Sequence, residues 1–157
     1  MSDLSEVRIL DYLRSGARST AENARAFRAC ASVGYADCVT FMLQEGNVDV
    51  HDANDEAIRL SSNGGHVDVV RLLLAYGADP GAIDSEALRN ASANGHLSVV
   101  ELLLHHGAVD PGARNSEALV RARANGHADV VQALLESHLT LELPDTSLLS
   151  RFTSRFT

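Results

Sequence analysis

The hydrophobic pattern of the chain repeats itself. Four segments carry aliphatic residues at the i, i+3 and i+4 spacing that gives a helix one buried face, and they are 36–43, 67–74, 97–104 and 128–135. A short turn containing a glycine precedes each segment. The four turn glycines are Gly34, Gly65, Gly95 and Gly126, at spacings of 31, 30 and 31 residues. A constant period of this length predicts a repeat architecture.

A second helical segment, rich in small residues, precedes each turn. These segments are 26–31, 57–62, 87–92 and 118–123. Small side chains let this inner helix approach its neighbours closely, whereas the helix after the turn must bury its valines and leucines. One helix pair cannot bury both faces, so we expect the pairs to stack into an all-α solenoid of helix-turn-helix units. Three outer segments then reach a glycine suited to a helix C-terminus, whereas the fourth has His138 there.

The repeated residues resemble the ankyrin-repeat family. The resemblance rests on the Gly-His turn, the Val-Val-x-x-Leu-Leu core after it and the ending Gly77-Ala-Asp79, and it covers about residues 17–138. It implies a solenoid with a finger loop between repeats. The period is shorter than the usual length of about 33 residues, and the missing residues fall in the linkers, so we expect short finger loops. Such shortened repeats are similar to those of amoebal proteins and of large DNA viruses that infect amoebae.

The chain has 157 residues, which suits one domain. We predict an N-terminal capping helix at 1–16, with Leu4, Val7, Leu10 and Leu13 on one face. The predicted repeats are 17–46, 47–77, 78–107 and 108–138, and a C-terminal capping segment follows at 139–157. Within it, Leu148, Leu149, Phe152 and Phe156 have helical spacing, which favours a capping helix over 146–157. The duplicated Ser-Arg-Phe-Thr of 150–157 also fits a frayed docking segment.

Charge and hydropathy narrow the classes of partner. The 13 basic and 21 acidic residues give a net charge of -8, which opposes binding to nucleic acid or to an anionic membrane. No apolar run approaches the roughly 20 residues that span a bilayer, and the N-terminus lacks the features of a signal peptide. We therefore expect a soluble, cytoplasmic protein.

The histidines suggest a metal site only weakly. His66, His96 and His127 occupy equivalent turns, so stacking places them about 10 Å apart. Zinc needs its ligands within about 2.1 Å of one centre, so these three cannot share an ion. The resemblance implies instead that each imidazole hydrogen-bonds the backbone where two repeats meet. His105 and His106 suit a helix C-terminus, and metal binding by this pair with His138 is the alternative.

Other chemical groups have structural interpretations. Ser85 and Ser116 precede glutamates and are predicted helix caps. An acidic cluster lacks the ligand spacing of a calcium loop and is predicted to be a solvated finger tip; its members are Asp49, Asp52, Asp55 and Glu56. Cys30 and Cys38 are expected to be small, reduced core residues. We predict neither a catalytic site nor a cofactor.

An arginine recurs on the inner helices. Arg28, Arg59 and Arg89 occupy one repeat position, which Val120 breaks in the last repeat. A recurring residue maintains the stack. We therefore expect the stems to pack on the stack and the guanidinium groups to bind neighbouring carbonyls or acids.

Residues that vary between repeats are the candidates for partner binding. In the family that the chain resembles, the inner helices and finger tips form the concave face on which partners bind. Aligning the inner helices on their glycines gives variable columns, from which we select a candidate set. The set is Leu60, Asn63, Asn90, Asn94, Arg121, Arg123 and Asn125. The alternative is that these positions are merely exposed and tolerant of substitution.

The sequence therefore favours a non-enzymatic module that binds a protein partner through the concave face of the solenoid. We expect a monomer. The alternative is a structural protein that associates weakly with itself, through the C-terminal Phe-containing helix or an open end of the solenoid.

Overall fold

The computed structural model describes residues 4–16 and 19–142, and these form nine α-helices and no strand. The helices are α1 (Leu4–Arg14), α2 (Thr20–Val33), α3 (Ala36–Gln44), α4 (Asp52–Gly64), α5 (Val67–Ala75), α6 (Ala82–Ala93), α7 (Leu97–His106), α8 (Ala113–Ala124) and α9 (Ala128–Glu142). The prediction of an all-α fold is confirmed.

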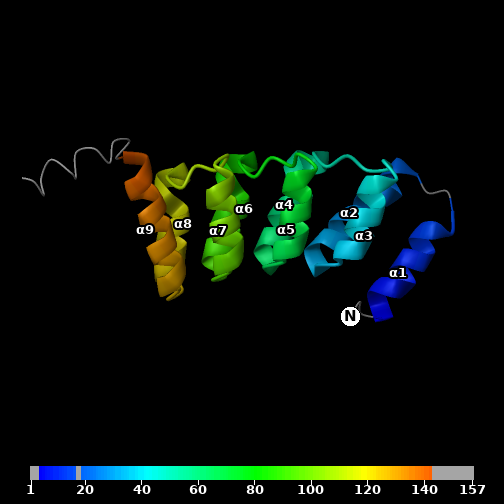
Figure 1. Cartoon of the computed structure of the whole chain (residues 1–157), viewed down its shortest axis with the longest axis horizontal. Coiled ribbons are helices and arrows are strands. Elements are labelled where there is room, and N and C mark those ends of the chain that lie inside the picture. Colours follow the sequence, from blue (N-terminus) through cyan, green and yellow to red (C-terminus); the bar gives the residue numbers. More distant parts are fainter. Residues whose placement is uncertain (1–3, 17–18, 143–157) are drawn as a thin grey trace, which may run out of the picture.

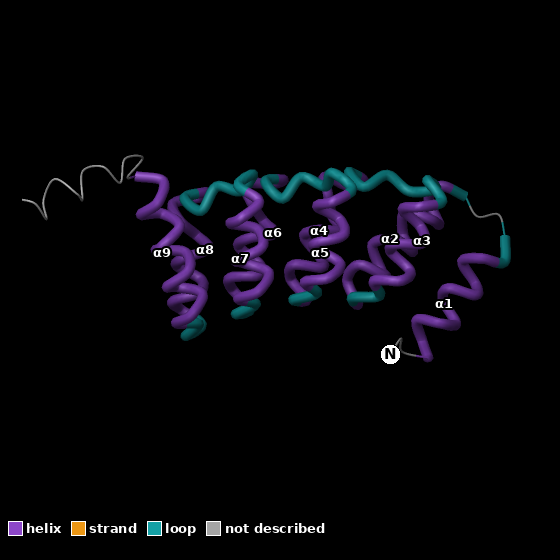
Figure 2. Tube along the Cα trace, in the orientation of Figure 1, coloured by secondary structure: helices purple, strands orange, loops and turns teal. Residues whose placement is uncertain are grey.

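The helices stand in two parallel rows. An inner row of α2, α4, α6 and α8 lies against an outer row of α3, α5, α7 and α9, and each consecutive pair packs on the next (Figure 1). The connections lie at opposite edges of the stack, as Figure 2 shows. Finger loops 45–51, 76–81 and 107–112 run along one edge, which we call the finger edge. The short glycine turns lie along the other, the turn edge.

The core lies between the rows and between successive pairs. The fully buried positions of the outer row are mainly valine and leucine: Val39, Val69, Val70, Leu73, Val99, Val100, Leu103 and Val130. The inner row buries small residues beside one large side chain in each of its first three helices, namely Phe27, Ile58 and Leu88. Each fully buried Val, Leu or Ile contributes about 1.5 to 3 kcal/mol. Because these side chains are shared between neighbouring pairs, stacking is what buries them.

The turn histidines join each repeat to the one before it. The Nε2–H groups of His66, His96 and His127 donate to the carbonyls of Ser32, Asn63 and Ala93, each at 3.0 Å. Each ring also lies against the turn glycine of the preceding repeat. A Cβ atom on that glycine would lie 2.5–2.6 Å from the imidazole Nδ1. The expected hydrogen bonds of these histidines to the backbone are confirmed.

Helix α1 packs against α3, at the start of the outer row. Leu10 and Leu13 are buried as predicted, but Val7 is 42% exposed. Glu6 is buried in its place and accepts hydrogen bonds from the backbone N–H groups of Asp37 (2.9 Å) and Cys38 (3.4 Å). The prediction for Val7 was wrong because the N-terminus of α3 presents free N–H groups that need an acceptor.

Left-handed backbone recurs at the finger edge, at residues 53–55, at residues 83–85, and at Arg114 and Ser116, whose φ values are 51° and 60°. Residues 53–55 and 83–85 have φ values between 51° and 58°. In the first, Asp55 is buried and its Oδ1 accepts from the N–H of Asp79 (2.7 Å); in the second, Ser85 Oγ accepts from the N–H of Asp110 (2.9 Å). Asp55 is therefore not solvated, and Ser85 binds the next finger loop instead of capping its own helix.

The predicted limit of the fourth repeat, at residue 138, lies within helix α9, which continues to Glu142. The predicted capping helix over 146–157 lies outside the described residues.

Candidate protein-binding face

Three members of the candidate set form one row across the inner helices. Leu60, Asn90 and Arg121 occupy equivalent positions on α4, α6 and α8. Leu60 and Asn90 are half-buried, and Arg121 is exposed. We call these three residues the recognition column. They bring an apolar, an amide and a cationic group onto one side of the stack.

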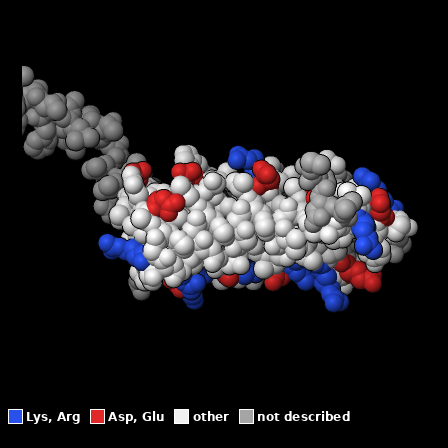
Figure 3. Space-filling model, turned by 90° about the horizontal axis from the view of Figure 1, so that it is seen from below, with Lys and Arg blue, Asp and Glu red and all other residues white. Residues whose placement is uncertain are grey.

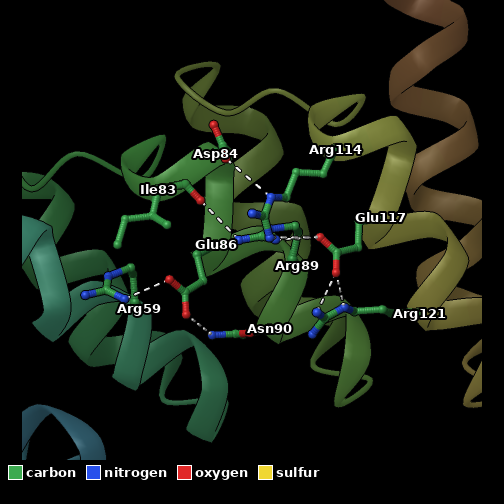
Figure 4. Close-up of polar contacts among 9 residues, drawn as sticks. All are labelled: Arg59, Ile83, Asp84, Glu86, Arg89, Asn90, Arg114, Glu117 and Arg121. Atoms are coloured by element: carbon green, nitrogen blue, oxygen red, sulfur yellow. Dashed lines mark hydrogen bonds and ion pairs between the residues drawn. The ribbon is translucent and has the colours of Figure 1, made fainter.

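A ladder of arginine–carboxylate pairs lies beside this column. Arg28 binds Asp52 and Glu56, Arg59 Nη1 binds Glu86 Oε2 at 2.7 Å, and Arg89 Nη1 binds Glu117 Oε2 at 2.5 Å. Each pair joins one repeat to the next, and Figure 4 shows the last two steps. The structural role predicted for these arginines is confirmed.

The ladder arginines also bind the left-handed segments. Arg59 donates to the carbonyls of Asn54 (3.1 Å) and Ala53 (3.0 Å), and Arg89 donates to the carbonyl of Ile83 (3.1 Å). These segments leave carbonyls outside the helical hydrogen-bond pattern, and the guanidinium groups satisfy them. The ladder thereby fixes the finger edge as well as the spacing of the inner helices.

The ladder stops at both ends of the stack because other residues occupy its positions there. Arg25 of α2 occupies the position that holds a ladder glutamate in the later repeats, and it is exposed. Val120 of α8 occupies the arginine position and is 59% exposed. Neither end therefore presents the ladder residue that would pair with another repeat.

Two members of the recognition column contact the ladder carboxylates. Asn90 Nδ2 donates to Glu86 Oε1 at 3.4 Å, and Arg121 donates to Glu117 Oε1 through Nε (2.9 Å) and Nη2 (2.5 Å). Hydrogen bonds from Arg89 and then Arg121 lower the pKa of Glu117. The stabilisation from this carboxylate is therefore present above the pKa it has in the unfolded chain and is lost as the pH falls through the lowered value.

The candidate asparagines at the turn edge form hydrogen bonds between neighbouring repeats. Asn94 Nδ2 donates to the carbonyl and to Oδ1 of Asn63 (3.1 and 3.0 Å), and Asn125 Nδ2 donates to the carbonyl of Ala93 (2.6 Å). Figure 3 views this edge and shows no charged side chains along its middle. The structure thus divides the candidate set into the recognition column and a neutral amide group.

Arg123 stands apart from both groups. The equivalent positions in the earlier repeats are Ala31, Ser62 and Ser92, and all three are fully buried by the following repeat. Arg123 is exposed on α8. It therefore marks the C-terminal end of the described stack.

The ladder glutamates were not selected from the sequence as binding partners of the arginines. Glu56, Glu86 and Glu117 recur at the period of the repeat, three residues before an arginine position. That recurrence was available as a signal. The sequence did not show which glutamate each arginine binds, because each arginine pairs with the glutamate of the next repeat and not with the one on its own helix.

A metal site finds no support among the side chains that the structure describes. They include no group of three or more His, Cys, Asp or Glu side chains placed to hold an ion. His105 Nδ1–H donates to the carbonyl of Glu101 at 2.7 Å, as a residue in the last turn of a helix can do. The side chain of His138 lies outside the described set.

Both cysteines are reduced and buried, as expected. Burial raises the pKa of both thiols, and for Cys38 burial together with the adjacent Cys30 raises it to about 12. We predict that alkylation of the folded protein at pH 8 is more than about a thousandfold slower than in denaturant, because the thiolate is the reactive form. Mass-spectrometric timing of iodoacetamide labelling checks this. Equal rates in the two states would contradict the burial.

Helix pairs joined by glycine turns, with histidines bridging the repeats, are the framework of one known family. Residues 51–104 match the family of ankyrin repeats. The family model is described as "Ankyrin repeats (many copies)", and its match runs from the start of α4 into α7. The flanking pairs α2/α3 and α8/α9 stack on this segment in the same manner, so the described fold is consistent with an ankyrin-repeat array.

No curated protein matches the chain. Within residues 4–16 and 19–142, no helix combines the length and the apolar character needed to cross a bilayer. Ankyrin repeats generally serve as protein-binding modules, and the family is typically non-catalytic.

Proposed function

We propose that this ankyrin stack is a non-enzymatic protein-binding module whose partner lies against the inner row, along the recognition column. The observation that carries the proposal is the position of Leu60, Asn90 and Arg121. They vary in chemistry between repeats whose framework residues recur, and they lie on the accessible side of the inner row. Variation at an accessible position of a repeated framework is what recognition requires.

The mechanism is rigid display. The histidine hydrogen bonds at the turn edge and the ladder near the finger edge fix the inner helices to their neighbours at both ends. The partner therefore does not have to order a loop on binding, which removes an entropic cost of association. Asn63, Asn94 and Asn125 offer a second, neutral contact area at the turn edge, and Arg123 extends it toward the C-terminal end.

Affinity capture with matched variants tests the proposal. Wild-type protein is compared with a Leu60→Ala/Asn90→Ala/Arg121→Ala variant and with an outer-row control, Arg71→Ala/Ser98→Ala/Gln132→Ala, whose three positions are exposed. Circular dichroism first shows that both variants fold. We expect a partner that wild type and control retain and the inner-row variant loses. Retention of every partner by the inner-row variant would refute the proposed face.

Self-association is the second candidate function, and the C-terminal end of the stack favours it. Val120 and Leu135 are 59% and 44% exposed there. Arg123 opposes a continuous stack, because a second copy in the same register would bury its guanidinium group. Sedimentation equilibrium tests self-association: a monomer at high concentration would rule it out.

A further inference from the structure

The outer row has a hollow between α7 and α9. Its volume is about 350 Å³, and its lining consists of Glu101, Leu104, His105, Ala133, Glu136 and Ser137. The hollow lies on the side of the stack away from the recognition column. Binding at the hollow is therefore independent of the function proposed for the inner row.

A missing side chain accounts for the hollow. Ala133 occupies the repeat position that holds Phe41, Leu72 and Leu102 in the other outer helices. Those larger residues pack partly buried against the core. Helix α9 therefore leaves open a space that a larger side chain fills in the earlier repeats. Leu104 and Ala133 form the apolar floor of this space.

The rim of the hollow is acidic. Neither Glu101 nor Glu136 forms an ion pair with a described residue, and Glu136 accepts only a hydrogen bond from Gln132 (2.9 Å). His105 uses Nδ1–H on the carbonyl of Glu101, so its Nε2 has no partner among the described residues. An apolar floor beneath two carboxylates complements an aromatic side chain next to an arginine.

The chain itself carries two such pairs beyond the described residues. Arg151–Phe152 and Arg155–Phe156 belong to the duplicated Ser-Arg-Phe-Thr, and residues 146–157 include two arginines and no acidic residue. The eight residues from Glu142 to Ser150 can span up to about 25 Å. Ala133 lies about 14 Å back along α9. The tail is therefore long enough to return to the hollow.

We propose that one Arg-Phe pair of the chain's own C-terminal tail docks in this hollow. The phenylalanine ring packs on Leu104 and Ala133, and the guanidinium group lies between Glu101 and Glu136. The tail is the favoured occupant because its charge is complementary and its attachment to α9 gives it a millimolar effective concentration. Docking covers the hollow beside Ala133 and leaves the inner row open.

A single tryptophan reports on this docking, since the chain contains no Trp. Phe152→Trp and Phe156→Trp are made separately in the full chain, and quenching of their emission by acrylamide is compared with that of a peptide of residues 143–157 carrying the same Trp. We expect quenching of at least one reporter to be several times weaker in the protein than in the peptide. Two reporters that are both quenched like the peptide would overturn the proposal.

Variants of the hollow show where the reporter lies. Glu101→Gln/Glu136→Gln removes the acidic rim, and Ala133→Leu fills the hollow with the residue that the earlier repeats tolerate. We expect both to raise quenching to the level of the peptide, and Glu45→Gln/Asp68→Asn, at exposed positions elsewhere, to leave it unchanged. Protection that survives both hollow variants would overturn the proposal. Protection that disappears on dilution would also overturn it, because the occupant would then be the tail of a second copy.

Discussion

Replacing Gly65 by alanine is expected to lower the free energy of unfolding by about 2 to 4 kcal/mol. Gly65 has φ +74°, and a Cβ atom there would lie 2.6 Å from Nδ1 of His96. The imidazole cannot move aside freely, because its Nε2–H is bonded to the carbonyl of Asn63. The substitution therefore combines backbone strain with loss of an inter-repeat hydrogen bond. Urea denaturation of both proteins measures the difference.

Two other glycines separate these causes. Gly107 has φ +76° and Gly126 has φ +79°, yet a Cβ atom on either would meet nothing within 4 Å. Gly126 occupies the same turn as Gly65, but no described repeat follows it. Alanine at these positions should cost only the backbone strain, about 1 kcal/mol. If Gly65→Ala cost no more than Gly107→Ala, the histidine would not hold the repeats together.

Replacing Arg89 by methionine is expected to lower the free energy of unfolding by about 2 to 3 kcal/mol. Arg89 is only 4% exposed, pairs with Glu117 and donates to the carbonyl of Ile83. Methionine keeps most of the apolar stem but leaves that carbonyl without its donor and Glu117 without its most buried partner. The loss is measured by the same denaturation experiment.

Arg114→Met provides the matched control for the ladder. Arg114 also pairs with Glu117, at 3.8 Å, but its side chain is 56% exposed. Exposed ion pairs contribute little, so we expect a change below about 0.5 kcal/mol. Equal effects of the two substitutions would mean that the ladder is a surface feature and does not set the spacing of the inner helices.

Features that recur from repeat to repeat were predictable from the sequence. The helix pairs, the histidine bonds and the structural arginines each appear several times at one period, so a local pattern indicated a long-range contact. The recognition column was predictable for the same reason, because Leu60, Asn90 and Arg121 vary against that background. Its binding role stays a prediction.

Other features depended on backbone conformation or on packing between elements. Asp55 and Ser85 bind the next finger loop because each stands in a left-handed segment within the first turn of its helix, and single-residue propensities gave no sign of these segments. Glu6 replaces Val7 on the buried side of α1 because α3 presents its N-terminus there. The sequence has Ala133 at the position of Leu72 and Leu102, but only the arrangement of α7 and α9 shows that the space stays open.

Amide hydrogen exchange of the stack, with and without its captured partner, tests the proposed binding face most directly. We predict slower exchange on partner binding in α4, α6 and α8 and in the finger loops 76–81 and 107–112, with α5 and α7 unchanged. Protection confined to α5, α7 and α9 would place the partner on the outer row and would refute the proposed binding face.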